Sequence, residues 1–292
     1  MEKTLHQKAH KAQGPPIRRS SDGGPIPAQQ LVREGRLLEA LHNLKEYVRK
    51  EPDNVGYRAF LFQLLAVLGQ WESALKQLNV LSDLDVAALP MLHLYGEAIQ
   101  CESLRKEIFA GRRRPVLLGE PPAWIAGLLE SIRLLGEGQY GPALSLRAEA
   151  FEQAPESSGT IKSSGTANGQ SFKWIADADS RLGPVIEVIV NAKYYWVPFQ
   201  QIRALTIPEP RDLRDTVWLP AQLEWTNGGQ AFGLIPARYA GSDSSPDPMI
   251  QAGRKTEWVA LADGVYAGQG QRMLATDQGE YALLDIREIR MD

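Results

Sequence analysis

The sequence predicts a multidomain α+β protein, in which a helical-repeat domain is followed by a small, mainly β, barrel-like domain. Two observations predict it. In the first half, a glycine is followed by a bulky apolar residue two positions later and by alanine five positions later, starting at Gly35, Gly69 and Gly138. In the second half, short strand-like segments alternate with turn residues, and no long helical pattern lies between them. The chain is therefore expected to be helical first and β afterwards.

The spacing of this glycine–alanine phrase indicates the type of repeat. Ala40 and Ala74 are 34 residues apart, and Ala74 and Ala143 are 69 residues apart, close to two such periods. A period of 34 residues is typical of tetratricopeptide helix pairs. The small alanine lets paired helices approach closely, the glycine forms the turn between them, and a proline, here Pro52 or Pro155, ends the second helix. Because arrays of this kind usually hold other proteins, the pattern predicts a binding scaffold.

Helical periodicity divides the predicted tetratricopeptide-like domain, residues 28–155. Helices are expected at 28–50 with a break at Gly35, and at 57–68, 75–81, 89–109, 124–135 and 141–153. Asp53 or Asn54 is expected to cap the helix at 57–68, which is apolar on nearly all sides and must be buried on both flanks. Residues 111–122 contain glycine and three prolines, so they interrupt the array. Residues 1–27 are polar and are expected to form a disordered leader.

The β part is predicted to begin after Pro155. Residues 156–171, rich in Ser, Gly, Thr and Asn, are expected to form a linker or a loose hairpin, and residues 172–292 the barrel-like domain. Strands are expected at 185–190, 194–197, 204–207, 216–219, 222–226, 230–235, 256–262, 270–276 and 280–285. Residues 227–229, Asn-Gly-Gly, form a strong hairpin signal, and residues 240–253 are expected to form a surface loop. Many short strands without long helices between them favour a small barrel or a barrel-like sandwich.

Composition argues against several kinds of partner. The chain has 292 residues, and its formal net charge of −3 argues against nucleic acid, whose phosphates attract markedly basic proteins. No run of 18 apolar residues and no apolar secretory segment is present, so the sequence predicts no membrane partner. Cys101 is the single cysteine, and no Cys/His cluster has the spacing of a zinc site. Neither a metal nor another cofactor is therefore expected, and the expected location is the cytoplasm.

The candidates for chemistry in the β half are Asp177 and Asp179. Two acids two positions apart can bind a hard cation or act as an acid–base pair, which leaves a metal-dependent or hydrolytic enzyme as an alternative function. The other interpretation is that the two acids cap a turn and that Arg181 pairs with one of them. Ser180 lacks the Gly-x-Ser-x-Gly context of a nucleophile, and none of the four histidines lies in the β half. No catalytic or metal-binding residue is predicted.

Aromatic residues are concentrated at 194–199 and recur at Trp218, Trp225 and Trp258. Because consecutive strand residues face opposite sides, some of these side chains must either reach the surface or be covered by the helical domain. Core and interdomain packing is the favoured interpretation, and a peptide-binding patch is the alternative.

The helical half contains a more specific candidate for partner binding. In tetratricopeptide pairs the first helix of each pair lines a concave face, where an amphipathic helix or an extended peptide can bind. Alignment of Ala74 with Ala143 places six residues on this face: Ala59, Gln63, Ala66, Leu128, Ile132 and Leu135. An apolar groove with small residues suits an amphipathic partner helix. The alternative is that the chain's own segments, such as residues 111–122, fill the groove.

Several longer stretches resemble a known family. They are RAFLFQLL (58–65), LGQW (68–71), GEPPAW (119–124), WIADADSRLGP (174–184), YYWVPF (194–199) and QRMLATD (271–277). Together, and in this order over roughly residues 30–290, they resemble the ImpE/TagJ (SciE) accessory proteins of bacterial type VI secretion systems. The leader 1–27 and a Ser/Gly-rich insertion around 162–169 depart from the family pattern.

The resemblance implies a cytoplasmic, non-enzymatic adaptor that is helical at its start and barrel-like at its end. It implies binding to the small subunit of the contractile sheath through the N-terminal helix of that subunit. It also implies an association with the ClpV-type AAA+ ATPase that dismantles contracted sheaths. A generic tetratricopeptide chaperone unrelated to secretion remains as an alternative. A homodimer is compatible with the repeat faces and with exposed strand edges.

Overall fold

The computed structural model of the chain describes residues 27–292. The expected leader, except for Pro27, lies outside these residues. The helical part contains α2 (Pro27–Arg33), α3 (Leu37–Lys50), α4 (Val55–Val67), α5 (Trp71–Leu84), α6 (Leu89–Phe109), α7 (Ala123–Gly136) and α8 (Tyr140–Gln153). A tetratricopeptide-like helical region followed by a β-rich region is therefore confirmed.

The glycine–alanine phrases mark the turns of three helix pairs, α2–α3, α4–α5 and α7–α8. Gly35 and Gly69 have φ angles of +77° and +64°, in the left-handed region that glycine adopts without strain. Ala40, Ala74 and Ala143 have no exposed surface, because each lies where its helix packs against its partner. The physical reasons for the repeat pattern are thus visible at each copy.

Helix α4 is the most deeply buried helix of the first two pairs. The Asn54 side chain accepts a hydrogen bond from the Tyr57 amide over 3.1 Å, as expected of an N-cap. Every residue from Ala59 to Val67 is buried. The helix is covered on both flanks because α3 and α5 pack against it and the β part contacts its remaining face.

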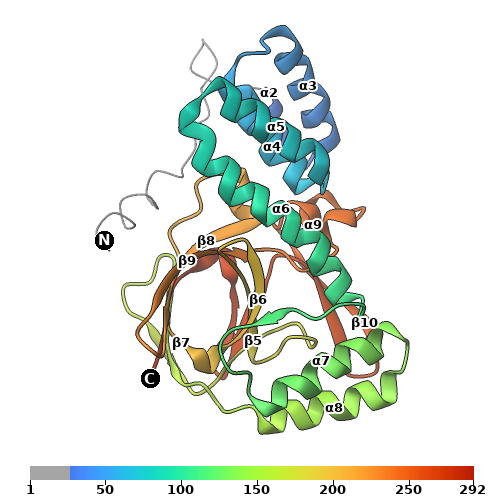
Figure 1. The fold of residues 1–292 in the computed structure, drawn as a ribbon, viewed down its shortest axis with the longest axis vertical. Coiled ribbons are helices and arrows are strands. Elements are labelled where there is room, and N and C mark those ends of the chain that lie inside the picture. The colour runs from blue at the N-terminus through green and yellow to red at the C-terminus, as the bar shows by residue number, and fades with distance from the viewer. Residues whose placement is uncertain (1–26) are drawn as a thin grey trace.

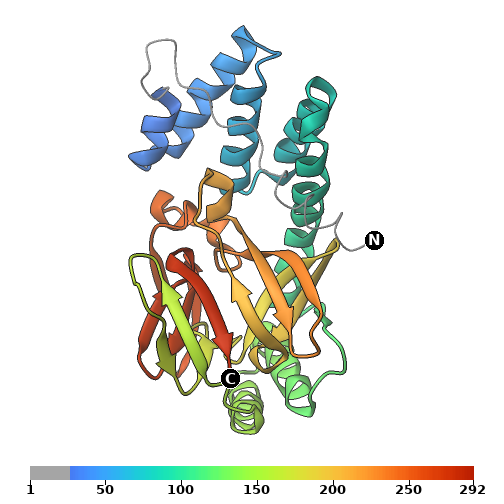
Figure 2. The ribbon, with the colours of Figure 1, turned by 90° about the vertical axis from the view of Figure 1, so that its left-hand side faces the viewer.

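The helices do not form one continuous stack. Helices α2–α5 lie at one end of the molecule and the α7–α8 pair at the other, and α6 runs along the strands between them (Figure 1). The same arrangement is seen from the side in Figure 2. Residues 111–122 cross from α6 to α7 and include a short strand, β1 (Val116–Leu117). The interruption expected from glycine and proline at this position is where the array divides.

The β part is built around one nine-stranded sheet. Its strand order is β1-β6-β5-β9-β8-β7-β14-β2-β3, and only the β1–β6 pair is parallel. The remaining strands of this sheet are β2 (Gly159–Ser163), β3 (Gln170–Phe172), β5 (Val185–Val190), β6 (Lys193–Pro198), β7 (Ile202–Thr206), β8 (Trp218–Trp225), β9 (Gln230–Pro236) and β14 (Ile286–Met291). The sheet has β1 and β3 as its two ends, with no hydrogen-bonded pairing between them. A closed barrel is therefore not confirmed.

Two smaller sheets accompany the large one. One contains β4 (Ile175–Asp177), β12 (Met273–Thr276) and β13 (Gly279–Ala282), and the other is the hairpin of β10 (Thr256–Ala262) and β11 (Val265–Gly270). Residues 156–171, expected to be a linker or a hairpin, supply β2 and most of β3, so they form a hairpin within the large sheet.

Four predicted strand segments differ from the structure for local reasons. The segments 216–219 and 222–226 are one strand, β8, and Pro220 is tolerated within it because β7 pairs with β8 only from Gln222 onward. The segment 270–276 is shorter, because Gly270 has a φ angle of +86° and bends the chain before β12. The end of 280–285 is a 3₁₀ turn, Leu283–Asp285.

Residues 240–253 were expected to form a surface loop, and this prediction is wrong. They contain a 3₁₀ turn, Ser242–Ser244, and a short helix, α9 (Pro248–Gln251), and they lie between the sheet and the helical repeats. Ile250 is fully buried. A Cβ atom placed on Gly69 would clash with the Asp243 carboxylate, so this segment approaches the α4–α5 turn closely.

Some of the aromatic residues pack between the helical and the β parts, whereas Phe199 and Trp225 pack in the core of the β part and Trp258 is 38% exposed. Trp196 and Trp218 have no exposed surface. The Trp218 ring lies 5.6 Å from Trp71 and 5.9 Å from Tyr95, and the Trp196 ring lies 5.7 Å from Phe109. The interpretation as core and interdomain packing holds at these positions, and the two parts share one continuous core.

Candidate functional site

Asp177 and Asp179 are held by donors from the chain itself. Asp177 accepts from the backbone amide of Asp179 over 2.9 Å and forms an ion pair with Arg272. Asp179 accepts from the Arg181 side chain over 2.6 and 2.9 Å and from the Gly268 amide over 2.8 Å. The turn-capping interpretation, with Arg181 paired to one acid, therefore describes these residues. No group of three or more His, Cys, Asp or Glu residues suited to a metal occurs in the described part of the chain.

The acid pair belongs to a larger buried charge network that joins the helical and β parts. Its centre is Glu187 on β5, which pairs with Arg105 of α6 over 2.5 Å and with Arg272. Tyr194 also donates to Glu187, and Trp196 donates to the Tyr194 oxygen over 2.7 Å. Buried charges are costly unless paired and hydrogen-bonded, and here each carboxylate oxygen of Glu187 has at least two donors.

Burial and neighbouring charges shift the pKa values of Asp177 and Glu187 in opposite directions. Burial alone would raise the pKa of Glu187, but Arg105 and Arg272 outweigh it, and the pKa is about 2. For Asp177 burial prevails over the attraction of Arg272 and raises the pKa to about 6. Burial also raises the pKa of the Cys101 thiol to about 12, so this sulfur stays protonated at neutral pH and is a poor nucleophile.

Two arginines of the β part cap helices of the repeat part. Arg238 donates to the carbonyl oxygens of Val67 and Ala66, at the C-terminus of α4, over 2.7 and 3.3 Å. Arg254 donates to the carbonyl oxygens of Val32 and Arg33, at the C-terminus of α2, over 3.0 and 2.9 Å. A cation at this end of a helix satisfies free carbonyls and interacts favourably with the helix dipole.

Five of the six predicted groove residues lie inside the molecule. Ala59, Gln63 and Ala66 are at most 2% exposed, Leu128 and Ile132 at most 3%, and Leu135 is half-buried. The two sets lie on α4 and α7, at opposite ends of the molecule, so they do not share one groove (Figure 1). In this conformation none of the five buried residues is open to a partner. Their role in partner binding stays a prediction.

The chain itself covers the face of α4 that the alignment selects. The Leu213 amide, at the start of the 3₁₀ turn Leu213–Thr216, donates to the Gln63 side chain over 3.0 Å. Arg214 of this turn stacks on the Tyr95 ring at 4.9 Å and is 2% exposed. The alternative of a self-filled groove therefore describes α4, although the filling segment comes from the β part and not from residues 111–122.

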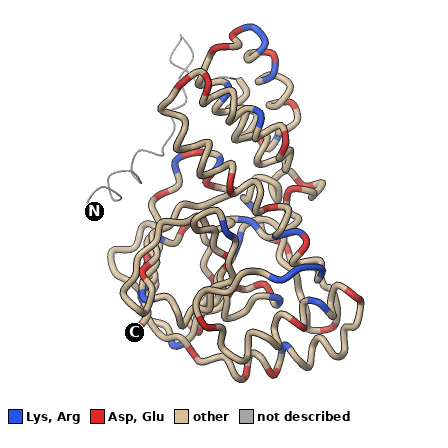
Figure 3. Tube along the Cα trace, viewed as in Figure 1, with Lys and Arg blue, Asp and Glu red and all other residues tan. Residues whose placement is uncertain are grey.

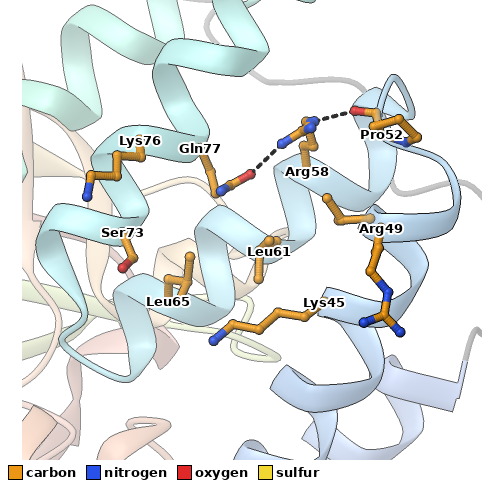
Figure 4. A pocket seen from close by; sticks show the side chains of 10 residues that line it. Lys45, Arg49, Pro52, Arg58, Leu61, Leu65, Ser73, Lys76 and Gln77 are labelled. Atoms are coloured by element: carbon orange, nitrogen blue, oxygen red, sulfur yellow. Dashed lines mark hydrogen bonds between the residues drawn. The ribbon is translucent and has the colours of Figure 1, made fainter.

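An open pocket lies elsewhere on the repeats, between α3, α4 and α5 (Figure 4). Its volume is about 530 Å³. The residues lining it are Lys45, Val48, Arg49, Pro52, Arg58, Leu61, Leu65, Ser73, Lys76 and Gln77. It therefore combines four cations with aliphatic side chains and has no acidic lining residue.

Sequence reasoning missed the charge network, the capping arginines and the basic pocket. Glu187 gave a signal, because it is the one charged residue in the strand segment VIEVIV, and charged residues in buried strands need partners. Lys45 and Arg49 gave another, because residues four apart share a helix face. Arg238 and Arg254 lie in an irregular segment, and nothing in the local pattern predicts that they reach helix ends.

Comparison with known proteins gives matches over both parts of the chain. A family model described as ImpE protein matches residues 169–290, and one described as tetratricopeptide repeat matches residues 31–93. The type VI secretion system accessory component TagJ of Pseudomonas aeruginosa is 50% identical over 263 residues, covering 90% of each chain. A crystal structure of a Vibrio parahaemolyticus protein superposes with a TM-score of 0.78 at 25% identity, covering 91% of this chain and 97% of that one.

None of the helices in the described residues is long and apolar enough to span a membrane.

Proposed function

Since this chain belongs to the ImpE/TagJ family, we propose that it is a non-enzymatic accessory component of a bacterial type VI secretion system. The observation that carries the proposal is the 50% identity to TagJ across both the helical repeats and the β part. Similarity that spans 90% of both chains covers the buried interface between these parts as well as each part alone. The proposal therefore concerns the whole molecule.

The partner we propose is the small subunit of the contractile sheath, bound through its N-terminal helix. Helical repeats recognise amphipathic helices by burying an apolar stripe in a groove. The rigid connection of α2–α5 to the sheet, through Arg238, Arg254 and the shared aromatic core, supports such a role, because a preorganised surface loses little conformational entropy on binding. We propose the cytoplasm as the place where this binding occurs.

A pull-down tests the helix mechanism directly. The full chain, immobilised, is expected to retain the intact sheath small subunit and to lose most of it when the N-terminal helix of that subunit is deleted. The folding of the deleted form is checked by its ability to assemble with its own sheath partner. Equal retention of both forms would contradict helix recognition.

We propose further that the protein modulates sheath disassembly by a ClpV-type ATPase. The expected result is a change in the rate at which purified contracted sheaths are dismantled when the full chain is added to the ATPase and ATP. Sheaths that lack the N-terminal helix of the small subunit serve as the control. An unchanged rate at saturating protein would remove this part of the proposal and leave sheath binding standing.

A metal-dependent or hydrolytic function at Asp177 and Asp179 receives no support from their geometry. Both carboxylates are buried and already accept from backbone amides and arginines.

A general tetratricopeptide chaperone differs from the proposed accessory component in which proteins it binds. Such a chaperone is expected to bind unfolded model proteins, whereas the accessory component is expected to prefer the sheath subunit.

A further inference from the structure

Strand β10 leaves a long edge of the β10–β11 hairpin unpaired. It is hydrogen-bonded to β11 on one side and to no other strand. It contains seven residues, whereas β1, β3, β4 and β13, which lie at the ends of the other two sheets, contain two to four. A long exposed edge is a template for pairing with another chain, so β10 is a candidate interaction surface.

The free backbone groups of β10 can be identified from its partner strand. The amides of three alternate β11 residues, beginning at Tyr266, donate away from β10 to side chains of other segments. Residues directly opposite each other in an antiparallel pair turn their backbone groups either both inward or both outward. The cross-strand partners Thr256, Trp258 and Ala260 therefore direct N–H and C=O groups to the free side, where no described residue bonds to them.

The side chains along this edge are apolar and exposed. All four residues from Glu257 to Ala260 are exposed, and Trp258 and Val259 are 38% and 40% exposed. The exposed Tyr266 side chain lies beside Ala260 on the same face, because the two residues are cross-strand partners. The edge therefore offers apolar surface next to its free backbone groups.

Charged residues are scarce along β10. Acidic and basic positions are interspersed along most of the chain (Figure 3), whereas Glu257 is the one charged residue of this strand. Lysine and proline, which commonly protect a strand edge from pairing, do not occur in it. Nothing in the composition of β10 therefore opposes the addition of another strand.

The hairpin is held firmly against the rest of the molecule. The Trp258 ring lies 5.6 Å from the Tyr239 ring, and Arg147 of α8 donates to the carbonyl oxygen of Gly264 at the hairpin turn over 3.1 Å. A preorganised edge loses little conformational entropy when it pairs.

We propose that β10 pairs antiparallel with β10 of a second copy of this chain, about a twofold axis at Trp258. This register places Trp258 opposite Trp258 of the second copy, and Thr256 opposite Ala260. All three outward-facing residues are then paired, with about six main-chain hydrogen bonds. The two hairpins form one four-stranded sheet, and the two indole rings lie on the same face of it, where cross-strand aromatic pairs are stabilising.

The order of charges along the edge favours this occupant. Arg254 and Lys255 precede β10, and Asp263 follows it. In the single chain Lys255 lies between Asp247 and Glu257, and Asp263 has no ion pair with any described residue. Antiparallel pairing brings the basic start of each strand to the acidic end of the other, so the edge is complementary to its own copy.

Cysteine cross-linking of the full chain tests the register. In Thr256→Cys/Ala260→Cys, each cysteine lies opposite the other in the second copy, at a Cα separation of about 5.5 Å that suits a disulfide. Mild oxidation is expected to give a covalent dimer on non-reducing electrophoresis. Within one chain the two positions are about 14 Å apart and cannot be bridged, and the native Cys101 is buried.

The single variants Thr256→Cys and Ala260→Cys are the matched controls. In the proposed register each of these cysteines lies about 14 Å along the edge from its copy. They are therefore expected to give at most about a tenth of the covalent dimer that the double variant gives.

Light scattering measures the association without cross-linking. The average mass of the unchanged chain is expected to rise with concentration toward that of a dimer, because one strand pair is a small interface. Trp258→Lys places like charges opposite each other and is expected to weaken association about tenfold or more, a loss of about 1.4 kcal/mol. Ala260→Pro, which removes an outward N–H, is expected to do the same.

The control for these variants is Val86→Lys, at a position on the helical repeats that is 74% exposed. It makes the same change in net charge as Trp258→Lys and is expected to associate like the unchanged chain. Circular dichroism is expected to show all three variants folded, because the substituted residues are exposed.

Several results would overturn the proposal. A monomeric mass at every concentration is one, and equal cross-linking of the double and single cysteine variants is another. A dimer that persists in both Trp258→Lys and Ala260→Pro would place the interface elsewhere. A monomeric chain whose capture of the sheath small subunit is lost in Trp258→Lys would make that subunit the occupant of the edge.

The inference goes beyond the proposed function and can fail separately from it. If the chain captures the sheath small subunit but stays monomeric, the β10 interface fails and the proposed function stands. If the chain dimerises through β10 but captures no sheath subunit, the sheath assignment fails and the interface stands.

Discussion

Glu187 is the residue through which helix α6, strand β5 and Arg272 are held together. We expect Glu187→Gln to lower the free energy of unfolding by about 3–5 kcal/mol, because Arg105 and Arg272 would stay buried without a carboxylate. Guanidinium denaturation followed by circular dichroism measures the loss. The control is Glu288→Gln, which breaks an exposed pair with Arg290 and is expected to cost less than about 1 kcal/mol. Similar losses in both variants would contradict a buried network.

The raised pKa of Asp177, in the same network, predicts that stability depends on pH. Its pKa is raised from an ordinary value of 3.8 to about 6 in the folded protein. The folded state therefore binds more protons than the unfolded state between these values, and the contribution of Asp177 to stability falls as pH rises from about 4 to 6. We expect the free energy of unfolding of Asp177→Asn, relative to the unchanged chain, to rise over this window. A constant difference between the two proteins across and beyond the same window would contradict the raised pKa.

The contribution of Glu187 to stability changes with pH in the opposite sense to that of Asp177, and at lower pH. Its pKa is lowered from 4.5 to about 2, so its stabilising contribution is complete above about pH 5 and is lost as pH falls toward 2.

Residue-level reasoning from the sequence could identify Glu187 as a charge that needs a partner. It could not identify Arg105 or Arg272, because they lie 82 and 85 residues away and meet it only in the fold.

At the level of elements, helix α2 is held at its C-terminus by a side chain of the β part. We expect Arg254→Met to increase hydrogen exchange in Pro27–Arg33 while leaving exchange in α7 unchanged, because two α2 carbonyl oxygens lose their donor. Mass spectrometry of the exchanged peptides measures this. Arg290→Met, at an exposed position on β14, is the control and is expected to leave α2 unaffected. Equal exchange of α2 in the two variants would show that the cap contributes little.

Sequence patterns predict elements well where local physics decides them. Strands β5 and β10 have the predicted bounds, and the Asn54 cap and the positive φ angles of Gly35 and Gly69 follow from local backbone chemistry. The prediction for 240–253 fails because its polar composition resembles that of a surface loop, whereas Ile250 packs inside. Sequence spacing assigns the face of α4 to a partner because it cannot show that Leu213–Thr216 covers this face.

For the whole molecule, we expect one cooperative unfolding transition. Trp71 of the repeats and Trp196 and Trp218 of the sheet belong to one core, so the two parts cannot separate without exposing large aromatic surfaces. Helix loss measured by circular dichroism and burial loss measured by tryptophan fluorescence are expected to have the same denaturant midpoint. Two separate transitions would contradict the shared core.

Repeat proteins ordinarily lengthen by copying their unit, since each new pair of helices finds the same neighbours as the last one. Here Arg238 and Arg254 reach from the sheet to the ends of α4 and α2. An extra pair inserted between α5 and α6 would displace both helix ends by a full repeat and leave Arg238 with the carbonyl oxygen of Gln251 but without its acceptors on α4. Duplication at this place would therefore break the hydrogen bonds by which the sheet holds the ends of α2 and α4.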